Sequence, residues 1–169
     1  RTRFSDDLLW LPYVTAEYVS ATGDESILTE SIPFLKGDAL KAGETERYTQ
    51  YEAAGDLHTL VEHCRRAIEK GNTSGAHGIP LMGAGDWNDG MNRVGHEGRG
   101  ECVWVGWFLH QTLTQFIPHC LEAGQGARVE VYEKHLDLLK TALEAHGWDG
   151  AWYRRAFFDD GTPLGSALN

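Results

Sequence analysis

Residues 101–123 read ECVWVGWFLHQTLTQFIPHCLEA and form a strongly apolar stretch. Large apolar side chains recur along it at helical spacing: Val103, Val105, Trp107, Phe108, Leu109, Leu113, Phe116 and Ile117. A helix with apolar residues on nearly all sides is typical of the interior of a domain. Gly124 and Gly126 interrupt the pattern. We therefore predict a central helix over residues 101–123.

Segments with one apolar face precede and follow this central helix. The spacing of leucine and valine predicts a helix over residues 56–71, with Asp56 as its N-cap, and an amphipathic helix over residues 129–146. A short helix is predicted over residues 25–31, whereas residues 36–55 are polar and poorly periodic. These segments supply the helices that would surround the central one.

The first helix is predicted over residues 5–23. Ser5 is a good N-cap, and Asp6 and Asp7 would occupy the first turn, where the helix dipole favours negative charge. Pro12 lies inside this segment, so it either kinks the helix or moves its start further along the chain.

Between the second helix and the central one lies a long glycine-rich loop, residues 72–100. A loop of this length is usually functional or disordered, and its Trp87, Met82 and Met91 argue against disorder. The tail, residues 148–165, is predicted as loop or short strand. No pattern indicates a parallel sheet, a GxGxxG motif or a P-loop, and consecutive helices with short turns pack antiparallel. The predicted fold class is all-α.

Composition excludes several classes of function. The formal net charge is −10, and the basic residues are scattered, which argues against a nucleic-acid partner because phosphate backbones require clustered Lys and Arg. No stretch approaches the roughly 20 apolar residues of a membrane-spanning helix. Cys64, Cys102 and Cys120 follow no metal-ligand or disulfide pattern, so we expect reduced, buried thiols. No HExxH or GxSxG motif occurs, and we expect no metal site.

The long loop contains the residues best suited to chemistry. Asp86 and Asp89 flank Trp87 and Asn88, with glycines on both sides. A carboxylic acid, an amide and an aromatic ring are the groups that bind and cleave a glycoside, since cleavage requires protonation of the leaving oxygen. The alternative is an Asx-turn, in which the Asp and Asn side chains cap their own backbone. The residues alone favour neither aspartate as the acid.

Two further polar clusters could have either a ligand-binding role or a purely structural role. Asp6 and Asp7 lie close to Arg1 and Arg3 in the sequence, where the alternative to ligand binding is helix capping. In the tail, residues 152–155 (Trp-Tyr-Arg-Arg) precede Asp159 and Asp160, for which a solvated turn is the bland interpretation.

Four segments in the same order resemble glycoside hydrolase family 94. They are residues 1–12 (RTRFSDDLLWLP), 78–91 (GIPLMGAGDWNDGM), 100–108 (GECVWVGWF) and 148–155 (WDGAWYRR). This family contains cellobiose, chitobiose and β-1,2-oligoglucan phosphorylases and the C-terminal region of cyclic β-1,2-glucan synthases. The opening segment is most similar to the synthase and β-1,2-oligoglucan branch. The resemblance covers nearly the whole chain, with residues 36–55 the least distinctive.

The resemblance implies part of an (α/α)₆ barrel and inverting phosphorolysis of a β-glucosidic bond, with inorganic phosphate as co-substrate and no other cofactor. It implies that Asp89 is the general acid and that Trp87 helps to bind the glycosyl group. An Asp and an Arg of the first segment would bind the same sugar: Asp7 matches the Asp, and Arg1 matches the Arg by spacing, with Arg3 as the alternative.

The resemblance also sets expectations for the whole protein. Residues 1–169 would be part of a catalytic domain, and the family's phosphate-binding residues would lie further along a longer chain, so these residues alone are expected to be inactive. Expected partners are a β-linked glucan or disaccharide, the remainder of the same chain and a second copy in a homodimer. The expected location is the cytoplasm, free or as the cytoplasmic domain of a bacterial inner-membrane protein. The alternative function is a non-catalytic, glucan-binding helical module.

Overall fold

The computed structural model describes residues 1–167, and for Glu122 the backbone alone. The helical elements are α1 (Trp10–Thr22), η1 (Glu25–Thr29), α2 (Leu60–Gly71), η2 (Asp89–Met91), α3 (Val103–Glu122), α4 (Gly126–Ala142) and the π-helical turn η3 (Leu143–Gly147). The strands are β1 (Ser31–Lys36), β2 (Glu52–Thr59), β3 (Glu101–Cys102), β4 (Ala156–Phe157) and β5 (Pro163–Leu164).

Helix α3 forms the centre of the molecule, as its all-round apolarity predicts. It packs against α1 and α4, and α2 packs against α1. Leu109, Leu113 and Phe116 are completely buried, together with Ile68 of α2. Burying one such side chain stabilises a fold by roughly 1.5–3 kcal/mol, so this cluster is the main source of stability of the helical layer.

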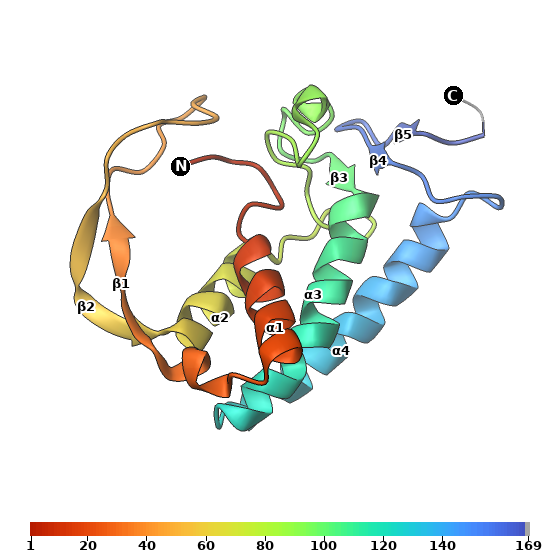
Figure 1. The fold of residues 1–169 in the computed structure, drawn as a ribbon. Coiled ribbons are helices and arrows are strands. Elements are labelled where there is room, and N and C mark those ends of the chain that lie inside the picture. The colour runs from red at the N-terminus through yellow and green to blue at the C-terminus, as the bar shows by residue number, and fades with distance from the viewer. Residues whose placement is uncertain (168–169) are drawn as a thin grey trace.

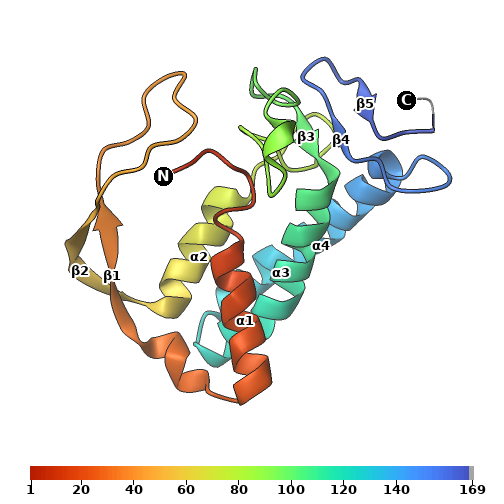
Figure 2. The same ribbon diagram turned by 45° about the horizontal axis from the view of Figure 1, so that its top comes forward.

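All four long helices have one end at the same side of the molecule. Helices α1 and α3 begin there, and α2 and α4 end there, as Figures 1 and 2 both show. Residues 72–100, the first nine residues and the tail all lie at this side, which we call the loop end. The long loop itself is irregular apart from η2 and isolated bridges, as predicted.

Helix α1 begins at Trp10, later than the predicted start after Ser5. Leu9 occupies the N-cap position and makes no side-chain cap bond. Ser5 does not cap the helix, because its amide and its hydroxyl both donate to the carbonyl of Gly85, at 2.9 and 3.1 Å. Pro12 then falls in the first helical turn, where its missing N–H costs no hydrogen bond.

The all-α prediction is incomplete, because the chain also forms two small antiparallel sheets. Strand β1 pairs with β2, with an irregularity between Pro33 and Leu35. Asp56 is therefore a strand residue, and α2 begins at Leu60 after Thr59, whose hydroxyl accepts from the amide of Glu62 at 3.3 Å. Neither strand contains a buried residue or an alternation of apolar and polar residues, so the sequence carries no period-2 signal.

The other boundaries differ by smaller amounts. The predicted helix over residues 25–31 is the five-residue 3₁₀ helix η1, and β1 begins after Glu30. Residues 101–102 form β3, so the central helix begins at Val103, and α4 begins at Gly126 and ends in η3. The tail contains the two short strands β4 and β5, as predicted. Within residues 1–167, no helix is long and apolar enough to span a bilayer.

Candidate active site

Short antiparallel pairings bring the four sequence motifs together at the loop end. Phe4 bridges Gly83, and Leu81 bridges Glu101. Strand β3 then pairs with β4, which follows the WYRR segment directly. Segments far apart in the sequence thus lie next to one another across the ends of the helices (Figure 2).

Gly83 is required where the first motif meets the long loop. Its φ of +62° lies in the left-handed region, and a Cβ added there would lie 2.5 Å from the carbonyl oxygen of Arg3. The amide of Ala84 donates to that same carbonyl at 3.1 Å. Any side chain at position 83 would therefore push the two motifs apart.

Asp86 is buried and fully engaged. Its side chain is 0 % exposed, and both of its carboxylate oxygens accept from Nη2 of Arg155, at 2.7 and 2.6 Å. The thiol of Cys102 donates to Oδ2 at 3.0 Å, and the amide of Asn88 donates to Oδ1 at 3.0 Å. The Asx-turn interpretation is therefore correct for Asp86. Its carboxylate joins the acidic loop to Cys102 and Arg155, and it is too deeply buried to contact a ligand.

Asp89 has the opposite environment. It is exposed at the start of η2, and within residues 1–167 its carboxylate has no hydrogen-bond or ion-pair partner. The side chain of Asn88 accepts from the amide of Gly90 at 3.0 Å and so caps η2. Of the two carboxylates, only the one on Asp89 is exposed and without a partner in the described structure.

Trp87 extends the exposed surface beside Asp89. Its side chain is 59 % exposed, and its ring meets the edge of Trp104 with ring centres 6.0 Å apart. Trp104 stacks on Phe108 at 5.3 Å, and Phe108 contacts Trp10 at 4.6 Å. A continuous series of aromatic rings therefore leads from the acidic loop onto α3 and α1, and flat rings of this kind suit the apolar faces of sugars.

Arg1 and Asp7 lie in the segment before α1, which is bonded to the long loop through Arg3, Phe4 and Ser5. Asp7 is exposed and accepts a hydrogen bond from the hydroxyl of Thr2. Nη1 of Arg1 donates to the carbonyl of Asp38 at 3.0 Å. Arg3 is held similarly, since its Nε and Nη2 donate to the carbonyls of Glu44 and Lys41. No hydrogen bond or ion pair in the described part of the chain joins Asp89 to Arg1, Asp7 or Trp87.

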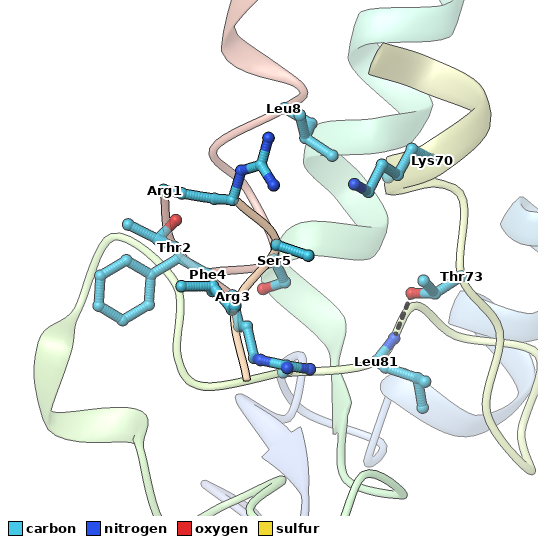
Figure 3. A pocket seen from close by; sticks show the side chains of 13 residues that line it. Arg1, Thr2, Arg3, Phe4, Ser5, Leu8, Lys70, Thr73 and Leu81 are labelled. Carbon is cyan, nitrogen blue, oxygen red and sulfur yellow. Dashed lines mark hydrogen bonds between the residues drawn. The ribbon is translucent and has the colours of Figure 1, made fainter. Parts of the chain in front are cut away.

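A cavity of about 350 Å³ opens beside this segment. It is lined by Arg1, Arg3 and Lys70 together with Phe4 and other residues of the first motif. Figure 3 shows the charged ends of Arg1 and Lys70 facing the same space. Neither Asp89 nor Trp87 lines the cavity. Three cationic side chains in a mostly apolar lining suit a ligand that carries hydroxyl groups as well as apolar faces.

Glu101 and His77 form a second buried polar contact that sequence reasoning missed. Glu101 is 2 % exposed, and its Oε1 accepts from the amides of His77 and Ile79 at 2.9 and 3.2 Å. Its Oε2 pairs with Nδ1 of His77, whose ring stacks on Phe157 with ring centres 4.3 Å apart. The sequence offers one signal for this contact: Glu101 is a charged residue at the start of an otherwise apolar stretch.

In the tail, Asp160 is exposed and accepts from the amide of Thr162, as a solvated turn predicts, but Asp159 differs. The side chain of Asp159 is 8 % exposed and accepts from the backbone amides of Glu97, Arg99 and Gly100. Burial raises the pKa of Asp159, but these three donors outweigh burial and leave the pKa below its usual value. Asp159 thus ties the tail to the end of the long loop.

The cysteines are free and buried, as predicted. Burial and the neighbouring Asp86 raise the pKa of Cys102 to about 12, and burial raises the pKa values of Cys64 and Cys120 to about 11. Thiols with such pKa values are poor nucleophiles at neutral pH. Within the described residues no group of three or more potential metal ligands occurs.

Comparison with known proteins identifies the family of this chain. The family model of the glycosyl hydrolase 94 superfamily, catalytic domain, matches residues 1–169. The chain belongs to this superfamily. The glycosyl hydrolase 94 superfamily is a family of enzymes. The relatives of this chain are named as one synthase and several phosphorylases.

Three relatives illustrate the range of the superfamily. The chain is 48% identical to the cyclic beta-(1,2)-glucan synthase NdvB of Rhizobium meliloti (strain 1021), over 100% of the chain and 6% of that protein. It is 37% identical to a 3-O-beta-D-glucopyranosyl-beta-D-glucuronide phosphorylase of Paenibacillus borealis, over 75% of the chain and 17% of that protein. It is 32% identical to a solabiose phosphorylase of the same organism, over 96% of the chain and 19% of that protein. The chain thus spans less than a fifth of each of these relatives.

Proposed function

We propose that this chain is part of the catalytic domain of an inverting enzyme that transfers glucosyl groups from β-glucosidic bonds to inorganic phosphate. The observation that carries the proposal is the contrast between the two aspartates around Trp87. Asp86 is buried and paired, whereas Asp89 is exposed, free and next to an exposed indole ring. Membership of the superfamily supports the same role for Asp89.

In the proposed reaction Asp89 is the general acid. Its carboxyl group donates a proton to the glycosidic oxygen as the bond from that oxygen to the anomeric carbon breaks. An oxygen of phosphate attacks the anomeric carbon from the opposite face and forms the new bond. Inversion of a β-glucoside therefore yields α-glucose 1-phosphate and a shortened acceptor. Phosphate is already anionic, so no second carboxylate is required as a base.

Trp87, Asp7 and Arg1 are the proposed binding residues for the transferred glucosyl group, with Arg3 as the alternative to Arg1. Trp87 offers an exposed ring beside the acid. Asp7 and Arg1 come from the motif whose Phe4 pairs with Gly83, three residues before Asp86. We infer that this segment and the acidic loop form opposite walls of one sugar site, on the inner-helix ends of an (α/α)₆ barrel.

Among β-glucans, a β-1,2-linked chain is the proposed substrate. The relative with 48% identity is named as a cyclic beta-(1,2)-glucan synthase, whereas the phosphorylases named above are 37% and 32% identical. Trp87 and Trp10 are 59% and 41% exposed, and two exposed indole rings suit a substrate of several sugar units.

The test is Asp89→Asn in the intact protein that carries this chain, assayed for phosphate-dependent release of glucose 1-phosphate from β-1,2-glucan. Because proton donation contributes about 10²- to 10⁴-fold, kcat should fall by that factor. Stability should not change, since the Asp89 carboxylate is exposed and unpaired in the described structure.

Asp137→Asn is the matched control, because Asp137 is an exposed carboxylate on α4. It should retain full activity. Full phosphorolysis by Asp89→Asn would refute the proposed acid. Glucan binding without any phosphate-dependent turnover in the unmodified protein would instead indicate a non-catalytic binding module.

A further inference from the structure

We propose that Arg155 is a positioning residue for the acidic loop: by binding Asp86 it fixes the turn that presents Asp89 to the glycosidic oxygen. The inference rests on the proposed function, because it assumes that Asp89 is the acid. It assigns a role to a residue of the tail that lies 69 positions from its partner in the sequence.

Arg155 is itself held firmly. Its amide donates to the carbonyl of Leu164 at 2.8 Å, and its carbonyl accepts from the amide of Val103 at 3.3 Å. Its guanidinium binds Asp86 through Nη2 and the sulfur of Cys102 through Nη1, at 3.1 Å. The same sulfur accepts from the amide of Val105 and caps α3. Arg155 therefore joins the acidic loop to the start of the central helix α3.

Two consecutive hydrogen bonds link the position of Asp86 to the position of Asp89. Asp86 Oδ1 accepts from the amide of Asn88, and Asn88 Oδ1 accepts from the amide of Gly90. Asp89 lies between these two bonds, at the first position of η2. Its backbone direction thus follows the orientation of the Asp86 carboxylate, which the Arg155 guanidinium holds together with the Cys102 thiol.

No other basic side chain in the described structure pairs with Asp86. Without Arg155, a buried carboxylate would face the nearby Asp6 with no cation, and it would turn toward water. Asn88 and Asp89 would move with it. A misplacement of about 1 Å in a reacting group can lower a rate by about 10²-fold, so Arg155 influences catalysis without touching the substrate.

The experiment compares Arg155→Gln and Arg155→Lys in the intact protein on two donors, each with phosphate. One donor is β-1,2-glucan, whose leaving group needs a proton. The other is 2,4-dinitrophenyl β-glucoside, whose leaving group departs as an anion without one. If Arg155 positions the acid, Arg155→Gln should lower kcat on the glucan by about 10²-fold. On the activated donor kcat should fall by less than about tenfold, and Arg155→Lys should recover part of the lost activity.

Two parallel variants separate the possible outcomes. Asp89→Asn should show the same difference between donors. Arg154→Gln is the matched control, because Arg154 donates to the carbonyls of His146 and Trp148 and does not contact Asp86, so it should behave as the unmodified protein on both donors. Full glucan activity in Asp89→Asn would refute the proposed function itself. Full glucan activity in Arg155→Gln, with Asp89→Asn inactive, would refute the positioning role alone, as would an equal loss on both donors.

If Arg155→Gln does not fold, the double variant Asp86→Asn/Arg155→Gln tests the same idea. It replaces the buried ion pair by two neutral amides and leaves no uncompensated charge. Its kcat on the glucan should fall by about 10²-fold, with most of the activity on the activated donor retained. Full glucan activity in this variant would overturn the proposal.

Discussion

The helical core and the loop end are held together by different forces. In the core, contacts are apolar, and completely buried side chains such as Phe116, Leu109 and Ile68 fill the space between the helices. At the loop end, apolar side chains such as Ile79 and Met82 are also buried, but directional contacts of charged groups are added to them. The buried carboxylates of the described structure, Asp6, Asp86 and Glu101, all lie at this end.

This difference indicates where stability and where function reside. Apolar burial is not directional, so it fixes which helices pack together and tolerates small shifts of each one. A charged hydrogen bond depends on distance and angle, so it can hold a loop in one geometry, although it gains little net stability. The loop end is therefore suited to positioning reactive groups and the core to supporting them.

The largest expected loss of stability comes from the core. Phe116→Ala should lower the free energy of unfolding by about 3–5 kcal/mol, because it removes a completely buried ring from α3. Urea denaturation of the intact protein measures the change, and Leu138→Ala, at a position 60% exposed on α4, is the control. The kcat of the folded fraction should remain unchanged. A loss of kcat without a loss of stability would break the distinction between the two regions.

A smaller loss is expected from Glu101→Gln at the loop end. Because the change weakens charge-assisted bonds from the His77 and Ile79 amides, it should cost about 2 kcal/mol. Hydrogen exchange should accelerate at these two amides, and Glu130→Gln on the exposed side of α4 is the control. A cost below about 0.5 kcal/mol would mean that the amides find other acceptors and that Glu101 does not hold the loop.

The smallest effect concerns Asp6, and it is a gain. Burial, followed by the charges of Asp7 and Asp86, raises the pKa of Asp6 above its ordinary value of 3.8, although the Trp10 indole donates to it. As the pH rises above 3.8, the unfolded chain loses this proton first, and the folded state then binds more protons. Stability due to Asp6 is therefore present below pH 3.8 and is lost as the pH rises through the folded pKa.

Asp6→Asn keeps an acceptor for the indole N–H and removes the charge. Thermal unfolding between pH 3 and pH 7 should show a variant that is more stable than the unmodified protein at neutral pH, with the difference vanishing at the acidic end. An equal difference at all pH values would show that the carboxylate is not the cause. The gain would sharpen the comparison, because it would show that the loop end retains a charge at the expense of stability.

Much of the fold follows from the sequence, because helices depend on local periodicity. The apolar spacing of residues 101–123 places the central helix within two residues of its observed start at Val103. The predictions fail where distant segments compete for the same groups. Ser5 is a good N-cap in isolation, but its hydroxyl donates to the carbonyl of Gly85 instead. Asp56 is predicted as an N-cap, but it lies in β2, which pairs with β1.

The sequence by itself determined the family, the main helices and the short loop around Trp87 that carries the candidate chemistry. The residue types alone could not distinguish Asp86 from Asp89, because both are aspartates close to the same aromatic ring, and only the family resemblance implied Asp89 as the acid. The tertiary structure adds the physical difference between them: Arg155 and Cys102 bind Asp86, whereas Asp89 is exposed. The reason is physical: the partner of a buried charge is whichever opposite charge the fold brings within hydrogen-bond distance, and that distance is unrelated to separation along the chain.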